Sequence, residues 1–208
     1  MRKTLTLTSL SLALTVLAAC GSTPSPTTAM PDNTTTPASA WKWDGKMLSG
    51  IHHVTLTTSK GDITVELDAE LAPKTVTNYM GLAASGYYDN LTFHRVIPGF
   101  MIQGGDPSGN GTGGQSIFGQ MFEDEIDTGK PAYKAGYKAG TIAMANRGPN
   151  TNGSQFFIMD QDYPLPPNYT IFGHVTKGLE VVNSIAHVAR DGNDMPKEKV
   201  TFSVKVVD

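Results

Sequence analysis

Hydrophobic and polar residues alternate along HHVTLTTSKGDITVELD, residues 52–68, and this pattern predicts two strands. Successive side chains of a strand point to opposite faces, so apolar residues at every second position mark a face that packs on a core. Lys60 and Gly61 separate the two runs and predict the turn of a hairpin. The apolar positions of the two runs are Val54, Leu56, Ile63, Val65 and Leu67.

The spacing of apolar residues after the hairpin is that of a helix. Pro73 suits the first turn of this helix, and Gly86 suits its end. A second amphipathic helix is predicted around LEVVNSIAHV, residues 179–188. The apolar positions of the first helix are Val76, Tyr79, Met80 and Ala83.

Short apolar runs recur through the rest of the chain, each of them long enough for one strand. They are TFHRVI, FMIQGG, GTIAMA, SQFFIM, TIFGHV and VTFSVKVV. Many short strands with only two helices favour an all-β protein built as a closed antiparallel barrel. Because neighbours along a strand face opposite sides, we expect Phe156 to point inward and Phe157 outward.

Composition limits the number of cores and the class of partner. A chain of 208 residues with 39% hydrophobic residues can bury one sizeable core. The formal net charge is -3 and no run of Lys and Arg is present, which argues against a nucleic-acid partner. We expect a monomer. The lone cysteine, Cys20, excludes an intramolecular disulfide.

The first nineteen residues have the pattern of a targeting segment. MRK supplies positive charge, TLTLTSLSLALTVLA is apolar, and LAAC places small residues before Cys20. The pattern resembles a bacterial lipoprotein signal, in which cleavage before the cysteine leaves that residue to carry the lipid. An ordinary secretory signal with a chance cysteine is the alternative. The resemblance places the protein in the bacterial cell envelope, lipid-anchored to a membrane outside the cytoplasm.

Residues 20–45 are predicted to form a tether between the lipid and a domain at residues 46–208. Ser, Thr, Pro and Ala dominate residues 21–40, and such a segment has little to pack. Trp41 and Trp43 follow, and they either pin the tether onto the domain or touch the lipid interface.

Four other patterns suggest a function but have ordinary structural explanations. GNGTGG, residues 109–114, has the glycine spacing of a dinucleotide site, but no helix pattern follows it, so a loop is expected. The acidic run at residues 123–127 is expected to be a solvated face rather than a cation site. The five histidines lack metal-ligand spacing, and Ser154 lacks the glycine pattern of a hydrolase nucleophile. We expect neither a metal nor another cofactor.

Two long stretches, FHRVIPGFMIQGGDPSGNGTGG and AMANRGPNTNGSQFFI, resemble the cyclophilin family of peptidyl-prolyl isomerases. The resemblance extends over residues 52–208, and the connection GYYDNLTFHRV looks like that of bacterial members. It implies an eight-stranded barrel capped by two helices, with the active groove on the outer surface. It also implies that the protein isomerises Xaa-Pro bonds in proline-containing polypeptides. With the predicted lipoprotein signal, the expected substrates are exported proteins during their folding.

The resemblance also assigns roles by position. Arg95 matches the catalytic arginine, and Gly111 lies where the neighbouring subsite begins. Tyr169 stands where the family has a histidine, and its ring can form one side of the proline pocket. The positions that match the walls of the proline pocket are Phe100, Met101, Phe157 and Leu165. In the family, four further positions hold the backbone of the substrate. They match Gln103, Ala145, Asn146 and Gln155, and Asn146 acts through its main chain.

These residue types suit the rotation of an Xaa-Pro bond. The barrier of roughly 20 kcal/mol reflects amide resonance, and no bond need break at its top. A twisted bond has lost charge separation, so an apolar pocket favours it, and its nitrogen gains a lone pair to which Arg95 can donate. A charged hydrogen bond contributes about 1.5 to 3 kcal/mol, whereas millisecond turnover requires about 5 to 6 kcal/mol. Desolvation and positioning must supply the rest.

The segment DYPLPPNYTIFG departs from the family pattern. Many animal cyclophilins have a tryptophan before the pocket leucine, where this chain has Pro164, and Tyr163 could fill part of the gap. That tryptophan helps to hold cyclosporin, so we expect weakened cyclosporin sensitivity here. Two further functions stay open at this point: a module that grips proline segments with incidental turnover, and a hydrolase acting on the same peptides.

Overall fold

The computed structural model describes residues 44–207. The predicted signal peptide, Cys20 and nearly all of the predicted tether lie outside these residues. Within residues 44–207, no helix combines the length and the apolar character needed to cross a membrane.

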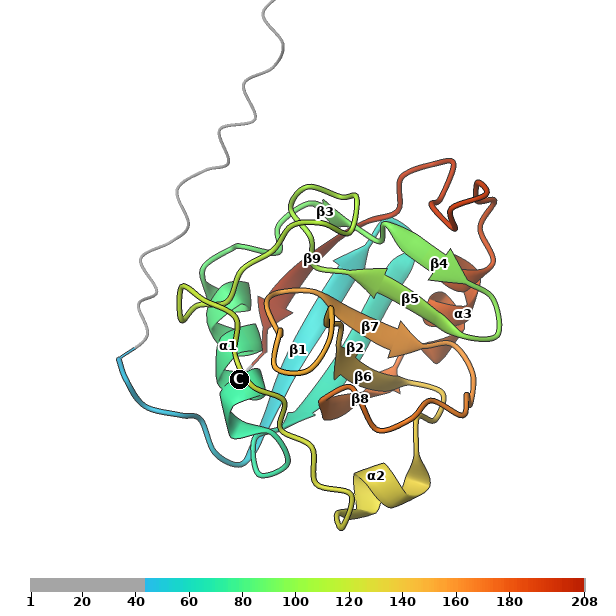
Figure 1. Cartoon of the computed structure of the whole chain (residues 1–208). Coiled ribbons are helices and arrows are strands. Elements are labelled where there is room, and N and C mark those ends of the chain that lie inside the picture. Colours follow the sequence, from blue (N-terminus) through green and yellow to red (C-terminus); the bar gives the residue numbers. More distant parts are fainter. Residues whose placement is uncertain (1–43, 208) are drawn as a thin grey trace, which may run out of the picture. The chain divides into compact units, whose positions relative to one another are not determined.

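Nine strands form one antiparallel sheet, and Figure 1 shows it curled around a central axis. The strands lie in the order β3-β9-β1-β2-β8-β6-β7-β5-β4. Their bounds are β1 Ile51–Thr58, β2 Gly61–Asp68, β3 Leu91–Thr92, β4 Arg95–Ile97, β5 Met101–Gly104, β6 Thr141–Met144, β7 Phe156–Met159, β8 Ile171–Lys177 and β9 Thr201–Val206. The predicted hairpin is present, because Thr58 of β1 pairs with Gly61 of β2.

The two ends of the sheet are consecutive pieces of one chain segment, residues 91–97. Its first half, β3, pairs with β9, and its second half, β4, pairs with β5. Between them, the backbone N–H of Phe93 donates to Val200 at 3.0 Å and that of His94 donates to Gln103 at 3.1 Å. Counting residues 91–97 as one bent strand gives a closed barrel of eight strands, so the predicted fold class is confirmed.

Both predicted helices are present, and both pack against the barrel, with β2 as the strand that they share. Helix α1, Pro73–Ala84, contacts β9 and β2, and helix α3, Leu179–Ala186, contacts β2, β4 and β5. Figure 1 shows these two helices on opposite sides of the sheet. A third, one-turn helix, α2 at Pro131–Ala135, was not predicted, since five residues are too few to show a helical period.

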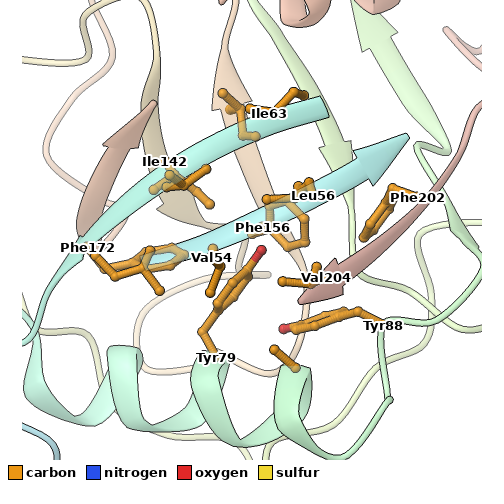
Figure 2. Close-up of a cluster of buried hydrophobic side chains, with 14 of the residues drawn as sticks. Val54, Leu56, Ile63, Tyr79, Tyr88, Ile142, Phe156, Phe172, Phe202 and Val204 are labelled. Carbon is orange, nitrogen blue, oxygen red and sulfur yellow. The ribbon is translucent and has the colours of Figure 1, made fainter. Parts of the chain in front are cut away.

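The barrel interior is a hydrophobic core shared by all of the long strands and α1. Figure 2 shows Tyr79 reaching from α1 toward the side chains of the sheet. Its ring packs edge-on against Phe156 at 5.3 Å between centroids, and the ring of Tyr88 packs against the same phenylalanine at 5.8 Å. Such aromatic pairs add about 0.5 to 1.5 kcal/mol each beyond the area they bury. Phe156 therefore points inward, as predicted.

The acidic run at residues 123–127 is only partly the solvated face that was expected. The backbone N–H groups of Lys74 and Thr75, in the first turn of α1, donate to the carboxylate of Glu125 at 2.9 and 2.7 Å. These are two of the N–H groups that a helix leaves without partners in its own first turn, and a negative charge there also suits the helix dipole. Glu125 thus caps α1 from about fifty residues away in sequence, which no local pattern reveals.

Candidate active site

The outer face of four neighbouring strands carries a row of site residues in register. Arg95 of β4 pairs with Gln103 of β5, which pairs with Phe157 of β7, which pairs with Ala143 of β6. Directly paired residues of antiparallel strands share a face of the sheet. The next row, shifted by one residue, points into the barrel. Phe157 therefore faces outward, as predicted.

A cavity of about 530 Å³ opens on this outer face. Ten of the eleven predicted site residues line it; the exception is Gln155. Four lining residues were not predicted, namely His94, Asn110, Asn193 and Met195. The predicted residues that the structure brings together are Arg95, Phe100, Met101, Gln103, Gly111, Ala145, Asn146, Phe157, Leu165 and Tyr169.

One half of the cavity is apolar, and buried tyrosines support it from behind. The ring of Phe157 meets that of Tyr169 edge-on at 5.4 Å. The hydroxyl of Tyr137 donates to the backbone oxygen of Tyr169 at 2.8 Å, and the hydroxyl of Tyr133 accepts from the N–H of Ile171 at 3.0 Å. Burial raises the pKa of Tyr133 and of Tyr137 to about 12, so both hydroxyls keep their protons at neutral pH. The unpredicted helix α2 supplies Tyr133 and so helps to shape this wall.

The other half of the cavity is polar and held by two amides. Gln103 donates to Gln155 at 3.0 Å, and Gln155 donates to the backbone oxygens of Gly111 and Gly113 at 3.0 and 2.8 Å. Gln155 thus uses both of its N–H bonds to hold the glycine loop. It lies in an adjoining cavity of about 110 Å³, where Arg147 also donates to the oxygen of Gly111 at 3.2 Å.

The glycine-rich stretch at residues 109–114 is a loop, as expected, and the carboxylate of Asp106 organises it. The N–H groups of Ser108 and Gly111 donate to this carboxylate at 2.8 and 2.7 Å, and that of Asn110 donates at 3.2 Å. Burial raises the pKa of Asp106, but these backbone bonds outweigh burial, and the pKa lies below its ordinary value. Asp106 therefore stays ionised and fixes the loop at the edge of the cavity.

Arg95 stands half-exposed at the edge of the cavity, and a buried histidine adjoins it. The Nε atom of Arg95 lies 3.8 Å from a carboxylate oxygen of Asp194. Neither ring nitrogen of His94 has a hydrogen-bond partner among residues 44–207. Burial lowers the pKa of His94; the charge of Asp106 opposes this shift and that of Arg95 adds to it. The imidazole is therefore neutral at pH 7, and Arg95 is the cation at this edge.

Tyr163 lies beside the cavity and not in its lining. Its ring stacks on that of Phe100 at 4.5 Å, while Leu165 reaches the lining two residues later. The described part of the chain brings no three His, Cys, Asp or Glu side chains into a group that could hold a metal ion.

Fold and cavity together define the class of this protein: a closed barrel with a packed interior that carries, on its outer surface, an apolar pocket edged by an arginine. A family model described as "Cyclophilin type peptidyl-prolyl cis-trans isomerase/CLD" matches residues 53–206. The chain belongs to the cyclophilin family and is a cyclophilin-type peptidyl-prolyl cis-trans isomerase.

Relatives and solved structures agree with this membership. The chain is 48% identical over 157 residues to peptidyl-prolyl cis-trans isomerase CYP18-2 of Arabidopsis thaliana, covering 74% of this chain and 93% of that protein. It is 48% identical over 157 residues to peptidyl-prolyl cis-trans isomerase-like 1 of Aspergillus fumigatus, covering 74% and 95%.

A crystal structure of a cyclophilin type peptidyl-prolyl cis-trans isomerase of Cryptosporidium parvum superposes with a TM-score of 0.71 at 39% identity, covering 76% of this chain and 98% of that chain. A second crystal structure of that protein, in the presence of the dipeptide ala-pro, gives a TM-score of 0.70 at 39% identity, covering 75% and 99%.

Proposed function

We propose that the cavity holds an Xaa-Pro segment with the proline ring in its apolar half and Arg95 beside the proline nitrogen. The observation that carries this proposal is the strand register, which sets Arg95 one strand from Gln103 and two strands from Phe157 on the same face. Apolar walls and a permanent donor thus share one cavity. A related structure determined in the presence of ala-pro supports a substrate of this class.

Catalysis in this arrangement requires only groups of the protein. The apolar walls favour the twisted bond over the planar one, because the twisted bond has lost charge separation. Arg95 donates to the lone pair that appears on the nitrogen as the bond twists, so the hydrogen bond strengthens in the transition state. The guanidinium suits this role because it keeps its charge at every relevant pH and presents several donors in one plane.

The substrates, we further propose, are exported proteins that the enzyme meets at a membrane surface. This proposal is supported by the sequence pattern that ends at Cys20 and by the Ser, Thr and Pro composition of residues 21–40. About twenty extended residues at roughly 3.1 Å each would let the domain work up to about 60 Å from the lipid.

The role of Arg95 is tested by Arg95→Ala in the full-length protein. Cis/trans exchange of an Xaa-Pro peptide, measured by NMR without a coupled protease, should slow by about tenfold or more with a native circular dichroism spectrum. Lys138→Ala is the matched control, since it removes a surface cation paired with Asp162 away from the cavity. Unchanged exchange in Arg95→Ala would refute the assigned role. If the exchange rate falls equally in both variants, the net charge of the protein, and not the position of Arg95, is the cause.

The anchor is tested separately in a bacterial host. Labelled fatty acid should enter the wild-type protein, and Cys20→Ala should abolish the labelling and release the protein from the detergent phase. Equal labelling of the two forms would contradict the lipoprotein proposal and leave the isomerase intact.

A further inference from the structure

The loop between α3 and β9 forms one wall of the cavity through Asn193 and Met195. It carries its own scaffold, because Asp191 accepts hydrogen bonds from the N–H groups of Asn193 and Met195 at 2.8 and 3.0 Å. The N–H of Asp191 in turn donates to the oxygen of Met195 at 2.9 Å. These bonds link Asp191, Asn193 and Met195 within the loop itself.

The same loop is tied to the strand that carries Arg95. The N–H of Val96, the residue after Arg95, donates to the backbone oxygen of Asp194 at 2.9 Å. Asp194 has a φ of +64°, a left-handed conformation that residues with a Cβ other than Asn and Asp seldom adopt. The fold therefore fixes the backbone of Asp194 directly beside the arginine.

The side chain of Asp194 lies between two arginines. One carboxylate oxygen accepts from the Nε of Arg190 at 3.2 Å, and the other lies 3.8 Å from the Nε of Arg95. Because the carboxylate of Asp194 lies nearest the Nε of Arg95, the two terminal nitrogens of the guanidinium remain able to donate to a substrate. Arg190 thus contacts the carboxylate of Asp194 on the side opposite Arg95.

We propose that Asp194 is a positioning residue, which orients the guanidinium of Arg95 for donation to the proline nitrogen. A role in stability alone does not account for it, because exposed pairs of this kind contribute little to folding: the Arg95 side chain is 44% exposed and that of Asp194 is 33% exposed. Orientation matters more in this position, since a small displacement of a catalytic donor costs much of its effect. The inference rests on the proposed role of Arg95.

The test compares two variants that both accept the left-handed backbone, Asp194→Asn and Asp194→Gly, in the full-length protein. We expect kcat to fall by about threefold to fivefold in each, with KM within about twofold of the wild type, as for loss of one exposed ion pair. Asp162→Asn is the matched control, because it breaks an exposed pair with Lys138 outside the cavity lining, and it should leave kcat unchanged.

Three further readouts separate orientation from a general structural effect. The NMR resonance of the Arg95 Nε–H group should shift in Asp194→Asn and stay in place in Asp162→Asn. In about 1 M salt the ratio of wild-type to Asp194→Asn kcat should approach one, because an exposed pair is screened. In the Arg95→Ala background, Asp194→Asn should cause no further loss.

Several outcomes would overturn the inference. If Arg95→Ala loses activity while Asp194→Asn and Asp194→Gly keep the wild-type kcat, Asp194 has no positioning role and the proposed function stands. A rise in kcat would show that the carboxylate restrains Arg95 rather than orienting it. If Arg95→Ala itself keeps full activity, the proposed function fails, and this inference fails with it.

Discussion

Two rows of side chains on the same four strands lie on opposite faces of the barrel wall. The inward row of β4, β5, β7 and β6 is Val96, Ile102, Ile158 and Ile142, and all four are fully buried in the core. The outward row, one residue away, is Arg95, Gln103, Phe157 and Ala143. A shift of one residue along a strand exchanges the two faces. The inward row therefore belongs to the barrel core, and the outward row lies on the face where the cavity opens.

Shortening a side chain of the inward row should cause the largest loss of stability. Ile102→Ala removes a fully buried side chain from the middle of that row, so we expect the free energy of unfolding to fall by about 2 to 5 kcal/mol, measured in urea. Turnover per folded molecule should stay near that of the wild type, because Ile102 does not line the cavity. A loss of stability below about 1 kcal/mol would contradict the assignment of this row to the core.

Its neighbour on β5 should behave in the opposite way. Gln103→Ala removes one amide hydrogen bond to Gln155 at the cavity, so kcat/KM for an Xaa-Pro peptide should fall by about threefold to tenfold. The free energy of unfolding should change by only about 0.5 to 1.5 kcal/mol. Gln115→Ala, in an exposed loop outside the cavity lining, serves as the matched control. Equal effects of Ile102→Ala and Gln103→Ala on both quantities would erase the distinction between the rows.

The sequence is most informative where a feature depends on nearby residues. The β1–β2 hairpin and both long helices follow from local periodicity, although the turn falls at Ser59 and Lys60, one residue earlier than expected. The inward and outward split of Phe156 and Phe157 follows from alternation. The choice of groove residues came from two continuous motifs that resemble one family, since periodicity alone does not say which outward residues form a site.

Two contacts that join distant segments were not predicted. The cap that Glu125 gives α1 and the approach of Asp194 to Arg95 each link residues about fifty to a hundred positions apart. Their signal lies in tertiary geometry, which a pattern read along one segment does not contain. Helix α2 was not predicted for another reason: its five residues are too few for a repeating helical pattern to be visible in the sequence.

The smallest expected effect concerns His94, which precedes Arg95 in the segment that closes the barrel and lines the cavity. Burial holds its pKa below the ordinary value of 6.5. Between that ordinary value and the lower folded value, the unfolded chain binds a proton that the folded protein does not. His94 therefore contributes its full stabilisation above about pH 6.5, and this contribution is lost as the pH falls through the folded pKa.

This loss can be isolated by comparing the wild type with His94→Gln, which cannot titrate at this position. The free energy of unfolding of both proteins is measured in urea at pH 7.5 and at pH 5.0, and the wild type should lose more over this interval. The two proteins differ only at residue 94, so the difference between the two losses belongs to that residue. A smaller loss in the wild type would mean that the charged imidazole is stabilised in the folded state, with the carboxylate of Asp106 outweighing burial and the repulsion of Arg95.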